Sequence, residues 1–223
     1  MKNDRRRFLT ATAALGLGQL VLPAGAARGD EKGEVSAAED LMREHGVLNR
    51  ILLIFEEGLR RKESDLSPDV FQKPALLVRK FLEDYHEKLE ENFIFPEFEK
   101  KKRLVDLVKV LREQHEAGRK ATDVMLRNSL PDRFSREAAR KDLMAACRAF
   151  IRMYRPHESR EDTVLFPELH RILPAKRIDE LGDLFEKEED RLFGDEGFEK
   201  TVEQVAALEK QLGIYNLSQF TPK

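Results

Sequence analysis

The sequence predicts an all-α protein, built as an antiparallel up-down four-helix bundle with additional C-terminal helices. From about residue 36 onward, apolar residues recur at spacings of three and four, which is the period of an amphipathic helix. No stretch alternates between apolar and polar residues as a strand would. One histidine-containing segment also occurs twice, 71 residues apart. Two helical hairpins packed together would account for the period and for the repeat.

The first hairpin is expected before about residue 98. Its first helix carries an apolar stripe made of Leu41, His45, Leu48, Leu52, Phe55 and Leu59. Residues 64–74 break this pattern, and Pro74 suits the first turn of the next helix. The second stripe ends near Pro96 and consists of Ala75, Val78, Leu82, His86, Leu89 and Phe93.

The second hairpin is expected after the basic run at residues 100–103. Its first stripe consists of Leu104, Val108, Leu111, His115, Gly118, Thr122 and Met125. Its second stripe runs into Pro167 and consists of Leu143, Cys147, Phe150, Tyr154, His157, Glu161 and Val164. We therefore assign residues 36–170 to the bundle. Residues 174–223 are expected to be a helical extension packed on it, without a histidine.

Each of the four stripes contains one histidine, and two of these histidines precede a glutamate by four residues. Residues four apart on a helix lie about 40° apart around its axis and about 6 Å apart along it, so each pair shares a face. A single histidine of this kind is more often a core or surface residue than a ligand. The whole set brings four imidazoles and two carboxylates into the bundle interior, from His45, His86, Glu90, His115, His157 and Glu161.

Buried carboxylates without compensation cost several kcal/mol, and bound cations remove that cost. A mixed set of imidazole and carboxylate donors favours a pair of iron or manganese ions over structural zinc. Cys147 is the single cysteine, so the chain has neither an internal disulfide nor a cysteine-based zinc site.

This pattern resembles the hemerythrin-like, HHE cation-binding family over roughly residues 36–170, because both His-Glu units run into Phe-Pro. The resemblance implies a non-haem diiron centre. It assigns one iron to His45 and His86, the other to His115 and His157, and a bridging role to Glu90 and Glu161.

The resemblance also has departures. Oxygen-carrying members have a fifth histidine one turn from the third-helix ligand, where this chain has Leu111 and Arg119. Their second bridging carboxylate is an aspartate five residues after its histidine. That position is Asp162 here, which makes Asp162 the reserve to Glu161.

The missing histidine makes reversible O2 carriage less expected and favours reaction with small oxidants. The first interpretation is a diiron protein that binds or reacts with O2, NO or peroxide. The second is an enzyme that decomposes peroxide or oxidises iron at the same centre. The third is a metal-stabilised structural or adaptor bundle, so the sequence leaves catalysis open.

Two further residues on the inward stripes have alternative interpretations. Tyr154 lies three residues before His157, where its hydroxyl is either a donor near the site, a redox-active group or a core group bonded elsewhere. Gly118 lies one turn beyond His115, and it either leaves room for a diatomic ligand or allows close helix packing.

Residues 1–26 are expected to form an export signal. They combine basic residues, an apolar run from Phe8 to Leu22 and small residues at Ala24 and Ala26. Arg5, Arg6, Phe8 and Leu9 resemble the twin-arginine pattern, which implies the twin-arginine export machinery as a partner and a periplasmic location. An arginine-rich signal for the general secretory route is the alternative. The apolar run is too short and too interrupted by Gly and Thr for a membrane span.

The charge balance argues against a nucleic-acid partner. The formal net charge is −2, and without the first 26 residues 36 basic side chains remain against 41 acidic ones. A mildly acidic domain without a basic block lacks the electrostatic footprint of a nucleic-acid-binding protein.

Overall fold

The computed structural model describes residues 35–222, so the expected export signal lies outside the described part of the chain. No strand occurs in this part, which confirms the all-α prediction. The first and third helices of the bundle are α1 (Ala37–Arg60) and α5 (Val105–Asn128). The second and fourth are composite. The second consists of α2 (Asp69–Leu77), η2 (Val78–His86), α3 (Glu87–Leu89), η3 (Glu90–Ile94) and α4 (Phe95–Lys101).

The fourth helix consists of α7 (Glu137–Arg160), η4 (Glu161–Leu165) and α8 (Phe166–Ile172). Short helices η1 (Glu63–Asp65) and α6 (Pro131–Phe134) lie in the connections. The chain continues through α9 (Ala175–Phe193), α10 (Gly197–Leu212) and the short η5 (Leu217–Phe220). None of the helices between residues 35 and 222 is both long enough and apolar enough to cross a membrane.

Local sequence explains where α1 begins. Ser36 accepts a hydrogen bond from the Glu39 backbone N–H at 3.3 Å, and the Glu39 carboxylate accepts one from the Ser36 N–H at 2.8 Å. This reciprocal capping box satisfies two backbone donors at the start of the helix. The capping box therefore determines where the helix that carries His45 begins.

The helix boundaries expected at Pro74 and Pro96 are wrong. Pro74 lies inside α2, which already begins at Asp69, and does not lie in the first turn of the helix. Pro96 and Pro167 do not end their helices either, because each lies at the start of a further helical segment, α4 or α8. Proline is tolerated at that point because a backbone N–H there has no partner in its own segment.

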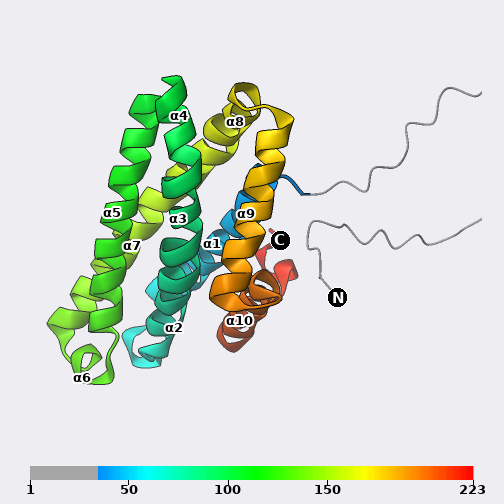
Figure 1. The fold of residues 1–223 in the computed structure, drawn as a ribbon. Coiled ribbons are helices and arrows are strands. Elements are labelled where there is room, and N and C mark those ends of the chain that lie inside the picture. The colour runs from blue at the N-terminus through cyan, green and yellow to red at the C-terminus, as the bar shows by residue number, and fades with distance from the viewer. Residues whose placement is uncertain (1–34, 223) are drawn as a thin grey trace, which may run out of the picture.

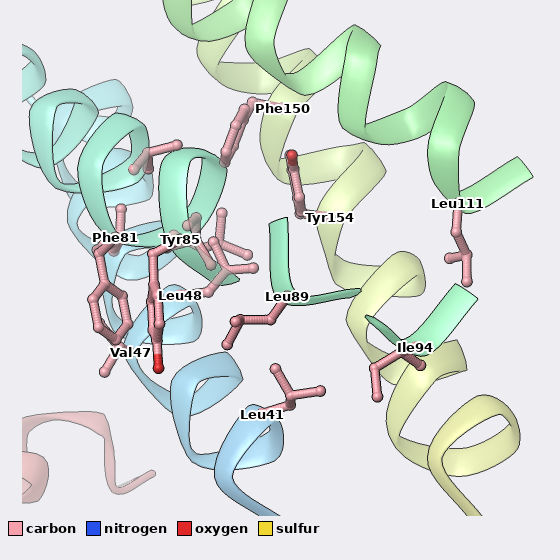
Figure 2. Close-up of a cluster of buried hydrophobic side chains, with 14 of the residues drawn as sticks. Leu41, Val47, Leu48, Phe81, Tyr85, Leu89, Ile94, Leu111, Phe150 and Tyr154 are labelled. Atoms are coloured by element: carbon pink, nitrogen blue, oxygen red, sulfur yellow. The ribbon is translucent and has the colours of Figure 1, made fainter. Parts of the chain in front are cut away.

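The four helices enclose a cluster of buried apolar side chains. The C-terminal helices lie along one side of the bundle (Figure 1). Figure 2 shows part of that interior, which includes Leu41 and Leu48 of α1 and Leu89 of α3. Helix α9 contacts α1 and η2, while α10 contacts α1 and α2. Arg50 of α1 also donates to the Glu209 carboxylate of α10 at 3.0 and 2.6 Å, which ties the extension to the bundle.

Two helical glycines provide a matched test of this packing. A Cβ at buried Gly118 would overlap the Tyr154 hydroxyl, whereas a Cβ at exposed Gly46 would have no neighbour within 4 Å. Gly118→Ala should therefore lower the free energy of unfolding by about 1–3 kcal/mol through overpacking. Gly46→Ala should raise it by up to about 1 kcal/mol because alanine favours the helix. Urea denaturation measures both changes, and a stabilising Gly118→Ala would contradict the packing described.

Candidate metal centre

Four histidines from four different bundle helices meet in the interior. His45 lies on α1, His86 at the end of η2, His115 on α5 and His157 on α7, and each is at most 4% exposed. They form two pairs, because the ring centroids of His45 and His86 are 4.8 Å apart and those of His115 and His157 are 5.0 Å apart.

The two glutamates lie between these pairs, and both are fully buried. Glu90 Oε2 lies 3.6 Å from Nε2 of His86 and 3.4 Å from Nε2 of His115. Glu161 Oε2 lies 3.2 Å from Nε2 of His157 and 3.4 Å from Nε2 of His45. Each carboxylate therefore contacts one imidazole of each pair, which is the placement required of a group shared by two cations.

These separations suit cation binding. Two ligand atoms that each lie about 2.0–2.2 Å from one cation are at most about 4.4 Å apart. The distances between Nε2 of the histidines and Oε2 of the glutamates are 3.2–3.6 Å and lie within this limit. The donor atoms form two groups, one of His45, His86 and Glu90 and the other of His115, His157 and Glu161.

The backbone widens at both glutamates. The Phe95 N–H donates to the Glu90 carbonyl and the Phe166 N–H to the Glu161 carbonyl, so each glutamate begins a π-helical turn. A proline follows each turn, and its ring would clash with the carbonyl four residues earlier in a regular α-helix. The wide turn accommodates the proline, and π-turns of this kind are frequent at functional sites.

The phenylalanines of the two repeats stack on the histidines of the neighbouring helices. The ring centroids of Phe166 and His45 are 5.7 Å apart, with an interplanar angle of 22°. Those of Phe95 and His115 are 5.5 Å apart, with an interplanar angle of 25°. The Phe-Pro unit therefore contributes an aromatic wall that restricts the orientation of one imidazole in each pair.

Every imidazole has a polar partner on its outer nitrogen, Nδ1. The Nδ1 atom lies 2.7 Å from Asp162 in His45, 2.7 Å from Glu44 in His86, 3.1 Å from Glu91 in His115 and 2.8 Å from Gln114 in His157. These acceptors favour the tautomer with the proton on Nδ1, so the Nε2 lone pair points inward. Asp162 therefore lies on the outer side of His45, and Glu161 occupies the position between the pairs.

The inner carboxylate oxygens have no such partner. Within residues 35–222, neither oxygen of Glu90 and neither oxygen of Glu161 forms an aligned hydrogen bond, and the same holds for Nε2 of His115. An unsatisfied buried polar group costs about 1–3 kcal/mol, and more when it is charged. Two shared cations would satisfy all of these atoms, so the donor set fits a cation pair.

The pKa values reflect the crowding of charge without cations. Burial alone would lower the pKa of His45, but the nearby carboxylates of Asp162 and Glu161 outweigh it and raise this pKa to about 10. Burial and the neighbouring His45 charge lower the pKa of His86. Burial and the Glu161 charge raise the pKa of Glu90 well above its usual range.

Tyr154 and Gly118 are explained by one contact. The Tyr154 hydroxyl donates to Glu87 at 2.5 Å, and a Cβ at Gly118 would overlap that hydroxyl. Tyr154 therefore fills the space beside Gly118, and of the two interpretations of this glycine only close helix packing fits. Arg119 links Glu87, at 2.7 Å, to Glu91, at 2.6 Å, so Tyr154 reaches His115 through other side chains.

Sequence reasoning missed the partners of Nδ1. The signal is present in the repeat, since Glu44 and Gln114 directly precede the first histidine of each hairpin and Glu91 and Asp162 directly follow its glutamate. His170, which has no counterpart in the repeat, is exposed on α8.

The fold and the buried histidine and glutamate cluster define a helical bundle built to hold cations. The family described as the hemerythrin HHE cation binding domain matches residues 36–169, and the chain belongs to this family. Over 231 residues it is 44% identical to uncharacterized proteins of Mycobacterium tuberculosis, from two strains, and of Mycobacterium bovis. These alignments cover 97% of this chain and 91% of each relative, so they extend into the C-terminal helices. No solved structure matches significantly.

Cation binding should release protons. With a pKa of about 10, His45 carries protons on both ring nitrogens at neutral pH in the cation-free protein, and the raised pKa of Glu90 favours its protonated form. Ligation needs both groups deprotonated, so affinity should rise with pH by about tenfold per unit for each proton released. Titration calorimetry at pH 7 in two buffers of different ionisation enthalpy measures this release.

Asp162→Asn should reduce the release because it removes a carboxylate that raises the His45 pKa. Asp123→Asn is the control, since Asp123 is exposed and pairs with Arg79. Equal heats for the unaltered protein in both buffers would contradict the protonation described.

Proposed function

We propose that this chain binds two iron ions and that the ion pair binds or reacts with O2, NO or peroxide outside the cytoplasm. The observation that carries the proposal is the set of buried, unsatisfied carboxylate oxygens between two pairs of inward-facing imidazoles. His45 and His86 would hold one ion and His115 and His157 the other, with Glu90 and Glu161 shared. The same donors accept manganese.

The bound iron would supply one-electron chemistry and a binding position for a small ligand. The residues of the chain hold and orient the ions. With the ions bound, the acceptors at Nδ1 would hold the ring proton on that atom and leave each Nε2 free for an ion, the stacked Phe95 and Phe166 rings fix two imidazole planes, and burial excludes bulk water. Each ion would be held by two imidazoles and the shared carboxylates, without a third imidazole, which would favour the addition of a small ligand.

The small-ligand proposal has a direct spectroscopic test with a matched control. Iron-loaded protein should change its visible absorption on addition of NO or peroxide. His115→Ala should lose bound iron and the response, because it removes a buried donor. His170→Ala should keep both, since this histidine is exposed and outside the cluster.

The outcomes separate the three interpretations of the sequence. An iron-loaded protein that shows no response to O2, NO or peroxide would support the structural bundle instead. Steady conversion of two peroxide molecules into two water molecules and one O2, lost in His115→Ala, would favour the enzyme.

The location outside the cytoplasm is supported by the residues of the N-terminal segment. Changing Arg5 and Arg6 together to lysine should leave an unprocessed precursor in the cytoplasm if the twin-arginine route is used. Arg7→Lys, at the position of the pattern where any residue is accepted, should be exported normally. Immunoblots of cell fractions measure both results, and normal export of the double variant would indicate the general secretory route.

A further inference from the structure

The internal repeat relates the residues of one cation position to those of the other. The hydrogen bonds to Nδ1 of the four histidines obey the same relation. The residue before the first histidine of each hairpin meets Nδ1 of the second histidine, through Glu44 in one hairpin and Gln114 in the other. The residue after each ligand glutamate meets Nδ1 of a histidine in the other hairpin, through Glu91 and Asp162. The inner donors are therefore equivalent, and any difference between the two positions comes from these outer groups.

Glu44 and Gln114 are related by the repeat but differ in charge. With the iron pair bound, whose positive charge favours ionised partners, Glu44 would accept from Nδ1 of His86 as a carboxylate, whereas Gln114 accepts from Nδ1 of His157 as a neutral amide. A carboxylate partner increases the electron donation of an imidazole more than an amide does. Both imidazoles of the His45 and His86 pair have a carboxylate partner, but only one of the other pair does.

Basic side chains near Glu91 increase this difference in charge between the two iron positions. The carboxylate of Glu91, which accepts from His115, also binds Arg119 at 2.6 Å and Lys88 at 2.6 Å. The repeat places Asn49 where Arg119 stands and Ser159 where Lys88 stands. Neither Glu44 nor Asp162 forms an ion pair with Lys or Arg in the part of the chain that the structure describes.

Other charges near His86 are mostly negative. Asp40 of α1 and Glu189 of α9 come within 4.8 Å of Glu44, and Arg43 approaches Asp40 at 3.4 Å. Glu158 lies near His45, and Arg155, whose charge also acts on Glu158, pairs with Glu56 at 2.6 Å. The C-terminal extension therefore adds a buried carboxylate on the same side as His45 and His86.

We propose that the two iron positions are electronically unequal, with the iron bound by His45 and His86 more difficult to reduce. This inference rests on the proposed function. One electron from an electrode converts the Fe(III)–Fe(III) pair to Fe(III)–Fe(II). That electron goes to the iron bound by His115 and His157, because negative charge stabilises the higher oxidation state at the other. Gln114 and Arg119 act as positioning and tuning residues for the reducible iron.

Spectroelectrochemical titration of the iron-loaded full chain tests the assignment. The unaltered protein should show two separate one-electron reductions. Gln114→Glu should lower the potential of the first reduction and leave the second nearly unchanged, because it adds charge beside His157. Glu44→Gln should raise the potential of the second reduction instead. Both variants should therefore reduce the difference between the two reduction potentials. Both substitutions keep the size of the side chain.

Glu113→Gln is the control, because Glu113 neighbours Gln114 but its side chain is 63% exposed. It should leave both reduction potentials unchanged. If any loss of negative charge near the site shifted the potentials, this variant would shift them too. Mössbauer spectra of the half-reduced protein should show one localised Fe(III) and one localised Fe(II).

The outcomes keep this inference distinct from the proposed function. The proposed inequality is overturned if both irons are reduced at one common potential. It is also overturned if Gln114→Glu shifts the second reduction. Neither result contradicts the proposal that the chain binds two irons. If Gln114→Glu does not fold, Glu44→Gln decides alone, and a shift of the first reduction in that variant overturns the assignment. Failure of the unaltered protein to bind iron overturns the proposed function itself.

Discussion

Two buried carboxylates among four imidazoles are the constraint on which the rest of this structure depends. Glu90 and Glu161 are fully buried, and no aligned hydrogen bond satisfies their oxygens. A bundle core tolerates such a pair only if nearby positive charge compensates it. The features around the pair serve this arrangement: the π-turns that begin at each glutamate, the stacked phenylalanines and the acceptors on each Nδ1. Together they direct nitrogen and oxygen donors at a common space.

The fold class and the convergence of the inner residues could be predicted because their signals are local. Helical periodicity shows which side of each helix faces inward, and a repeated segment shows that two hairpins are alike. The boundaries at Pro74, Pro96 and Pro167 were less predictable. A proline next to a π-turn does not end a helix, and the sequence period does not reveal where such a turn begins. The export signal stays a prediction, since it lies outside the described residues.

The outer contacts could not be predicted because they depend on which helices face each other. Asp162 reaches His45 across 117 residues of sequence, and Gln114 reaches His157 across 43. Periodicity places these side chains near the interior but not against a particular nitrogen. The role of Gly118 is also ambiguous from the sequence, because the Tyr154 hydroxyl reaches the space beside it only through the packing of α5 against α7. The repeat gives the inner donors near-symmetry, and the outer residues break it, so any functional difference between the two positions originates outside the direct ligands.

Crystallography with anomalous scattering, combined with metal analysis of the same protein, tests the central claim most directly. The account predicts two cations per chain, one bonded to Nε2 of His45 and His86 and the other to Nε2 of His115 and His157. Oxygens of Glu90 and Glu161 should lie between them. A single cation, binding through Nδ1, or a cation-free protein in which these glutamates face solvent would contradict it.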